Sequence, residues 1–214
     1  MKKNYFCFFL FVLFFLVFQF NLVRASGPLD GKVFVLDAGH GGVDPGSVVG
    51  DVYEKDINLA IVLKVKEKLM EKGAKVILTR EGDYDLGTPK AVYRKKSDFD
   101  HRIMLINNSQ ADYYISIHLN YLDDSSYDGP QVFYSNVLED NQPLALKIQN
   151  YLNSKLEKDR EIKKISNTIY MYSKLKIPGV LVECGFLSNS TERKRLLDDN
   201  YIDLFSTYLV ESFL

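Results

Sequence analysis

Cysteine is scarce in this sequence, and its scarcity excludes two ways of stabilising a domain. Only Cys7 and Cys184 occur among the 214 residues, and Cys7 lies in an apolar N-terminal run. If that run is removed on export, Cys184 stands alone, which excludes an intrachain disulfide framework and a thiolate-based zinc knuckle. The chain must therefore rely on a packed core, for which 46% hydrophobic and 26% charged residues are sufficient.

An excess of positive charge is also missing. The formal net charge is −1, and removing residues 1–25 takes away three basic residues and no acidic one, which leaves 24 basic residues against 28 acidic ones. This balance argues against a nucleic-acid partner, which would favour a basic patch. The sequence also contains no GxGxxG and no GK[ST], so neither a dinucleotide fingerprint nor a P-loop is present.

What the sequence does have is a long apolar run at its start. Two lysines precede the run from Tyr5 to Phe20, and Val23-Arg24-Ala25 offers a small-residue cleavage site. These features are typical of a secretory signal. Extended to Val23, the run is also nearly long enough for an uncleaved anchor. We expect residues 1–25 to be a signal peptide or N-terminal membrane anchor, with no other membrane contact, and the rest of the chain to work outside the cytoplasm.

From Lys32 onward, strand and helix patterns alternate. The apolar run at 33–36 predicts a buried strand, 56–72 a helix and 75–79 a strand, which together form a right-handed parallel crossover. Further strands are expected at 113–117, 131–134, 168–172 and 180–182, and further helices at 99–107, 144–156, 191–197 and 202–214. We predict a single catalytic domain over 32–214 with a three-layer α/β fold, a mainly parallel twisted sheet with helices on both faces.

Polar residues end three of these predicted strands. His40, His118 and Glu183 each follow an apolar run, and Glu54 comes just after the first glycine-rich loop. Because strand ends at one edge of a parallel sheet converge, we expect these four residues to share one site. Two histidines and one carboxylate are a zinc-ligand set with an open fourth position. A second carboxylate would then be available as a general base for water.

Each of these residues also has an ordinary structural interpretation. Glu54 before a helix can simply complement the helix dipole. His118 can be a hydrogen-bonded core histidine, and Glu183 can pair with an arginine. Their joint placement at strand ends favours the shared site over these separate explanations.

Two nearby residues offer rival chemistry. His101 is the third histidine, but it lies beside Arg102 within a predicted helix and not at a strand end. Cys184 follows Glu183 and raises the possibility of a Cys–His nucleophilic hydrolase. Alternation along the strand points Cys184 to the face opposite Glu183, so we expect a small buried hydrophobe there.

Five sequence motifs, in this order, resemble those of one enzyme family: DAGHGGVDPG (37–46), EKDINL (54–59), LTR (78–80), SIHLN (116–120) and VLVECGFLSN (180–189). They are similar to the zinc-dependent N-acetylmuramoyl-L-alanine amidases of the amidase-3 type, and the likeness runs from Lys32 to the C-terminus. It implies a peptidoglycan hydrolase that cleaves the amide joining the lactyl group of N-acetylmuramic acid to L-alanine. The short form also resembles the germination-specific amidases of spore-forming bacteria. That likeness implies a place in the cell wall or the spore cortex space, with roles in muramic-lactam formation and germination.

The resemblance also implies roles for individual residues. His40, Glu54 and His118 would bind Zn²⁺, and Glu183 would be the catalytic glutamate. Asn120, Arg80 and Arg102 are candidate substrate-binding residues, and Asp44 is a candidate supporting residue. Surface ion pairing is an equal alternative for the two arginines, and turn formation for Asp44 and Asn120.

The chain also departs from the family in ways that leave questions of substrate and partner open. Leu119 stands where alanine is common, and no wall-binding module follows the predicted domain. Beyond the substrate, which consists of glycan strands with stem peptides, a membrane-tethered protein partner is therefore a hypothesis for targeting or metal loading. Another zinc peptidoglycan hydrolase would share the same ligands. A catalytically silent or partner-dependent wall protein is a further alternative, although the loss of Glu183 that would mark a silent scaffold is not seen.

Overall fold

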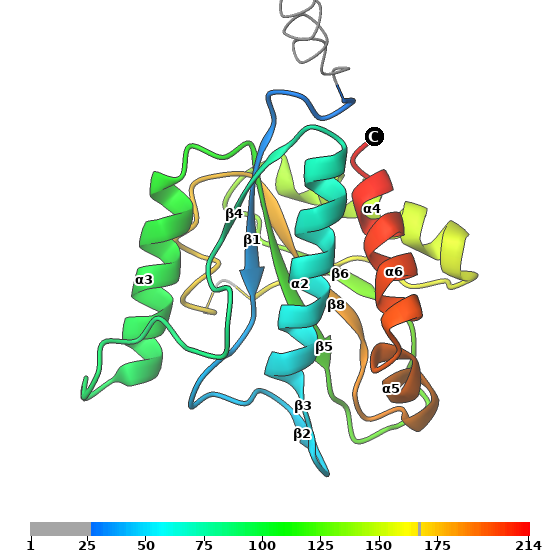
Figure 1. The fold of residues 1–214 in the computed structure, drawn as a ribbon, viewed down its shortest axis with the longest axis horizontal. Helices are drawn as coiled ribbons and strands as arrows, with labels where there is room; N and C mark the ends of the chain where they lie inside the picture. The colour runs from blue at the N-terminus through cyan, green and yellow to red at the C-terminus, as the bar shows by residue number, and fades with distance from the viewer. Residues whose placement is uncertain (1–26, 167) are drawn as a thin grey trace, which may run out of the picture.

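A six-stranded sheet forms the centre of the computed structural model, which describes residues 27–166 and 168–214 (Figure 1). Its strands, in spatial order, are β4 (Lys75–Leu78), β1 (Val33–Ala38), β5 (Tyr113–Asn120), β8 (Gly179–Phe186), β6 (Gln131–Tyr134) and β7 (Lys163–Lys164). The first four are parallel to one another, and β6 runs antiparallel to β8. The predicted, mainly parallel α/β domain is thus confirmed, whereas the predicted signal or anchor lies outside the described residues.

Five helices of the described residues pack around the sheet. One face is covered by α2 (Glu54–Glu71), α4 (Asn141–Leu156) and α6 (Asp199–Glu211), with α5 (Ser190–Leu196) leading into α6 (Figure 1). The other face is covered by α3 (Arg94–Asn108) and by residues 165–166 and 168–177. Within the described ranges, no helix combines the length and apolar character needed to cross a membrane.

Alternation of side chains along the strands divides the core into two clusters, one on each face of the sheet. Ile115, Ile117 and Leu119 of β5 belong to the larger core beneath α2, α4 and α6, whereas Tyr114 belongs to the smaller core with α3. Because side chains alternate along a strand, Ser116 and His118 share the face of Tyr114. Polar side chains therefore collect on the α3 face of the sheet.

The predicted strand at 168–172 is wrong. The backbone forms turns there, with hydrogen bonds from Ile169 N to Ser166 O and from Lys174 N to Met171 O. Met171 and Tyr172 are buried all the same, because these turns lie over the α3 face of the sheet. These residues are apolar because they are buried against the sheet, although they form no strand, and the sequence pattern therefore resembled that of a strand.

Other differences concern bounds and short elements. The hairpin of β2 (Val48–Val49) and β3 (Val52–Tyr53) and the short β7 were not predicted. Helix α3 begins at Arg94, earlier than expected, so the loop after β4 is shorter than predicted. Strands β5 and β8 continue through His118 and Glu183, which lie inside these strands and not at their ends.

Candidate active site

The loop after β1 presents His40 in an unusual backbone conformation. Its φ of 61° lies in the left-handed region, which few non-glycine residues adopt. Two neighbouring glycines allow the loop to approach the site closely. A Cβ at Gly39 would lie 2.3 Å from the His118 ring, and one at Gly46 would lie 2.7 Å from both the His40 ring and the Glu54 carboxylate. The glycine-rich sequence is therefore required by close packing around these three side chains.

His40, Glu54 and His118 come together from three separate elements. His40 lies in the loop after β1, Glu54 begins α2 and His118 lies in β5. Glu54 Oε1 is 3.1 Å from His40 Nε2 and 3.0 Å from His118 Nδ1. One ligand atom from each of the three lies within 4.8 Å of the others. The structure thus brings together the three residues predicted to bind a metal, and we refer to them as the triad.

The arrangement around Glu54 fits a divalent metal ion. Besides the two histidine nitrogens, Asn58 Nδ2 at 3.2 Å and Leu119 N at 3.1 Å also surround Glu54 Oε1. Four nitrogens around a single carboxylate oxygen exceed the two lone pairs that this atom offers. A cation shared by the histidine nitrogens and the carboxylate would satisfy all three ligands, and two imidazoles with one carboxylate suit zinc.

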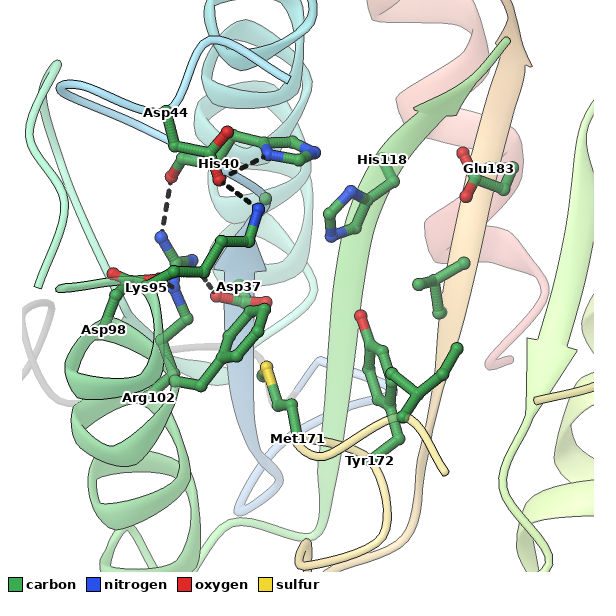
Figure 2. A pocket seen from close by; sticks show the side chains of 14 residues that line it. Asp37, His40, Asp44, Lys95, Asp98, Arg102, His118, Met171, Tyr172 and Glu183 are labelled. Carbon is green, nitrogen blue, oxygen red and sulfur yellow. Dashed lines mark hydrogen bonds and ion pairs between the residues drawn. The ribbon is translucent and has the colours of Figure 1, made fainter. Parts of the chain in front are cut away.

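Asp44 supports the ring of His40 from the side away from Glu54. Its Oδ2 lies 3.0 Å from His40 Nδ1 and accepts a hydrogen bond of 2.7 Å from Lys95 Nζ (Figure 2). Burial alone would lower the pKa of His40, but the carboxylates of Asp44 and Glu54 raise it to about 9. A carboxylate behind a metal-ligating histidine fixes the ring orientation and the tautomer, so Asp44 leaves Nε2 directed at the triad.

Glu183 lies beside the triad on the neighbouring strand. It pairs in register with His118 across β5 and β8, and both line one cavity together with His40 (Figure 2). Its Oε2 is buried and has no hydrogen-bond partner among the described residues. Burial raises the pKa of the carboxyl group to about 8, with a further rise from the charge of Glu54 and an opposing effect of His40. The free oxygen is placed to exchange a proton with a molecule in this cavity.

Cys184 takes no part in this site. It is fully buried in the larger core, on the opposite face of the sheet from His118 and Glu183, and burial raises the pKa of its thiol well above the usual range. A neutral thiol is a poor nucleophile. The expectation of a buried apolar role for Cys184 is thus confirmed.

Arg102 binds the backbone of the glycine-rich loop that follows β1. Its guanidinium donates to the carbonyl oxygens of Ala38 at 2.8 Å and His40 at 2.7 Å. It also forms buried ion pairs with Asp37 at 2.5 Å and Asp98 at 2.9 Å. Although Arg102 borders the cavity, these contacts occupy four of its five N–H donors. They favour a role in positioning His40 over the predicted contact with substrate.

Arg80 also binds the backbone at the start of this loop. Its donors bind the carbonyl oxygens of Ala38 and Gly39, each at 3.0 Å, and that of Lys55 at 2.7 Å. The side chain is buried behind the loop. These contacts likewise favour positioning over the predicted substrate contact.

The remaining candidates take different places. Asn120 ends β5 and lines an open cavity beside Glu183, so its predicted role in substrate binding stays a prediction. His101 lies in α3, outside the triad. Sequence reasoning missed Asn58, which donates to Glu54 Oε1. Its position one helical turn after Glu54, in the same motif, is a signal that could have found it.

Comparison with known proteins agrees with this site. The family model described as N-acetylmuramoyl-L-alanine amidase, Amidase_3, matches residues 34–212. The chain belongs to this family. It is 41% identical to the germination-specific N-acetylmuramoyl-L-alanine amidase of Bacillus subtilis, over 88% of this chain and 81% of the relative. The enzyme is accordingly an N-acetylmuramoyl-L-alanine amidase that acts on peptidoglycan, and its family implies a location outside the cytoplasm.

Solved structures of this family are also similar to the amidase. The CwlD amidase from Clostridioides difficile, in complex with the GerS lipoprotein, aligns with a TM-score of 0.80 and 38% identity over 85% of this chain and 96% of that chain. The catalytic domain of CwlV from Bacillus (Paenibacillus) polymyxa aligns with a TM-score of 0.72 and 28% identity over 85% and 96% of the two chains.

Proposed function

We propose that the amidase hydrolyses the bond between the lactyl group of N-acetylmuramic acid and L-alanine with Zn²⁺ held by His40, Glu54 and His118. The convergence of these three ligand atoms within 4.8 Å of one another carries the proposal. Zinc in such a site supplies Lewis acidity, which polarises a carbonyl oxygen and makes water a stronger acid. The protein provides the three ligands and the neighbouring Glu183.

Glu183 acts as the general base and then as the general acid. Its unpartnered Oε2 takes a proton from the attacking water and returns it to the nitrogen of L-alanine as the amide bond breaks. Burial raises the pKa of this carboxyl group to about 8, near the range in which one group can both accept and donate a proton. Burial around the carboxylate also excludes bulk water from the proton transfer.

The substrate we propose is the cortex peptidoglycan of spores. The B. subtilis relative, which is 41% identical, is named a germination-specific amidase, and this supports the assignment. In that setting, removing the stem peptide would prepare muramic acid for lactam formation and so mark the cortex for germination. Another zinc peptidoglycan hydrolase would use the same ligands, and only the products distinguish the two.

A complementation experiment tests the cortex role. The chain is expressed in sporulating B. subtilis that lacks its own germination-specific amidase, and the muramic-lactam content of the cortex is measured by mass spectrometry. We expect lactam to be restored by the wild type and not by Glu183→Gln. A cortex that keeps its peptide-substituted muramic acid in the presence of the active wild-type protein would contradict the role.

We also propose that a membrane-tethered lipoprotein partner targets the amidase or supports its metal loading. The C. difficile CwlD structure, which contains the GerS lipoprotein, supports a partner of this kind. We expect the purified chain alone to bind zinc or peptidoglycan weakly, and the partner to strengthen one of these. Full zinc occupancy and full wall binding by the isolated chain would refute the proposal. A chain that shows no amidase activity either alone or with its partner would refute it as well.

A further inference from the structure

Lys95 lines three cavities in or beside the candidate site, and two of them also include residues of the triad. The first, of about 260 Å³, extends from the triad along α3 and is bounded by Phe99, Met171 and Leu181. The second, of about 320 Å³, lies next to the first turn of α3. The third lies on the other side of the triad and is bordered by polar groups. A substrate that occupies any of these cavities would therefore lie near the positive charge of Lys95.

Lys95 also keeps hydrogen-bond donors for a ligand, and it is the cation that these three cavities share, whereas Arg102 lines only the first and Arg94 only the second. The guanidinium of Arg102 binds two carbonyl oxygens and two carboxylates, and that of Arg94 binds the Asp85 carboxylate with two of its nitrogens. The Lys95 ammonium donates to Asp44 Oδ2 at 2.7 Å, and its side chain is 58% exposed. Because an ammonium carries three donors, two remain for an incoming anion.

We propose that Lys95 binds a carboxylate of the stem peptide and thereby places the peptide, and not the glycan, on the α3 side of the triad. The inference rests on the proposed amidase function. Uncrosslinked stem peptides continue from L-alanine into D-glutamate, which is linked through its side chain and keeps a free α-carboxylate. The glycan strand beside the scissile amide offers hydroxyl and acetamido groups but no comparable anion. A free cation therefore distinguishes the peptide from the glycan.

The position of Lys95 suits a carboxylate one residue beyond the scissile bond. Lys95 Nζ contacts Asp44, and Asp44 in turn lies 3.0 Å from His40 Nδ1, so the ammonium is two contacts away from the triad. Consecutive Cα atoms are about 3.8 Å apart, so the α-carboxylate of the second residue can reach this ammonium while the amide lies at the triad.

The opposite cavity has the character of a glycan site. It is open, and besides Lys95 and the triad its lining includes Ser47, Asn120 and Tyr121, which is 48% exposed. Hydroxyl and amide groups can bond sugar hydroxyls, and an exposed aromatic ring can pack on the apolar face of a sugar. Lys95 borders both cavities, but only the cavity along α3 adds Phe99 and Met171, and only the open cavity adds Asn120 and Tyr121. The first therefore suits the peptide, and the second suits the sugar.

A pair of substrates that differ in one group tests this assignment. Two disaccharide tripeptides are compared, identical except that the α-carboxylate of D-glutamate is a carboxamide in the second. We expect the wild-type enzyme to cleave the carboxylate substrate about tenfold more efficiently, in kcat/KM, because a charge-assisted hydrogen bond is stronger than a neutral one. Lys95→Gln should lose this preference through slower cleavage of the carboxylate substrate, and Lys95→Arg should keep most of it.

Lys96 provides the matched control. Its ammonium pairs with Asp100 at 2.7 Å and lies over the Tyr170 ring, so Lys96→Gln removes the same charge without touching the three cavities. It should keep the wild-type preference. A wild type that cleaves both substrates equally, or a Lys95→Gln variant that keeps the preference, would overturn the proposal. The proposal would also be overturned if Lys95→Gln lowered kcat/KM equally on both substrates and bound zinc more weakly. Lys95 would then act through Asp44 and not on the substrate. Cleavage of neither substrate by the wild type would instead contradict the amidase function.

Discussion

The guanidinium of Arg102 donates a hydrogen bond of 2.7 Å to the backbone carbonyl of His40. This contact holds a residue that we propose binds zinc and whose φ of 61° is otherwise unfavourable. The histidine is therefore positioned from its backbone by Arg102 as well as from its ring by Asp44.

Arg102→Lys should weaken zinc binding while leaving the fold in place. Lysine keeps the positive charge but cannot reach two carbonyls and two carboxylates with a planar fork. We expect zinc affinity to fall about 10- to 100-fold, the usual effect of losing a group that supports a metal ligand. Competition with a fluorescent chelator measures it. The control is Arg94→Lys in the same helix, whose partner is Asp85. Equal zinc affinity in both variants would contradict the positioning role.

Asp44→Asn should also weaken zinc binding, because the amide cannot orient His40 as the carboxylate does. We expect a loss of about tenfold in affinity, with little change in the thermal stability of the metal-free protein. Asp112→Asn serves as the matched control, since Asp112 binds the start of β1 at the far end of the sheet. A metal titration followed by calorimetry compares the variants, and an unchanged affinity in Asp44→Asn would argue against this arrangement.

The Asp37–Arg102 ion pair should make stability depend on pH. Burial raises the pKa of Asp37, but the charge of Arg102 and hydrogen bonds from Ser116 and Thr79 outweigh it and hold the pKa below its usual range. Because the folded-state pKa is lower than the unfolded-state value of about 3.9, the ionised pair stabilises the fold above that pH. This stability is lost as the pH falls through the folded-state pKa.

Asp37→Asn should therefore destabilise the protein at neutral pH. Breaking this buried pair leaves Asp98 as the one carboxylate paired with Arg102 and costs up to about 3–5 kcal/mol. The difference from the wild type should shrink as the pH falls from about 4 toward the folded-state pKa, because Asp37 of the unfolded wild type then binds a proton that the folded state does not. Urea unfolding over this pH range measures the difference. A constant difference at every pH would show that charge is not the cause.

Zinc should stabilise the folded chain through the triad. A ligand that binds the folded state alone adds about 2.7 kcal/mol at one hundred times its dissociation constant. We expect the melting temperature to rise with zinc concentration in the wild type and to stay unchanged in His118→Ala. Differential scanning fluorimetry with and without a chelator follows the shift. An equal rise in the variant would place the bound ion elsewhere.

Much of the fold was predictable because apolar periodicity reflects burial directly. The runs at 33–36 and 113–117 are strands, and 56–72 is helical over nearly its whole length. Alternation also placed Cys184 and Glu183 on opposite faces of one strand. The convergence of His40, Glu54 and His118 followed from the parallel topology, although only the structure gives the distances that join them.

The features that could not be predicted depend on contacts between distant residues, which produce no recognisable pattern in the local sequence. Polar His118 and Glu183 lie inside β5 and β8, so each strand was expected to end too early. The segment at 168–172 is apolar because it covers the sheet, and not because it pairs with it. Nothing near Arg80 or Arg102 in the sequence indicates that their guanidinium groups bind backbone carbonyls of a distant loop.

The most direct test of the proposed chemistry is a digest of purified peptidoglycan, scored by mass spectrometry for free stem peptides that begin with L-alanine. We expect zinc-dependent release by the wild type and a rate at least about 100-fold lower with Glu183→Gln, since a general base contributes about that much or more. Zinc content, measured in the same samples, should be equal in the two proteins. Release of stem peptides by Glu183→Gln at the wild-type rate would contradict the role of Glu183. Products cleaved at any other bond would contradict the amidase assignment itself.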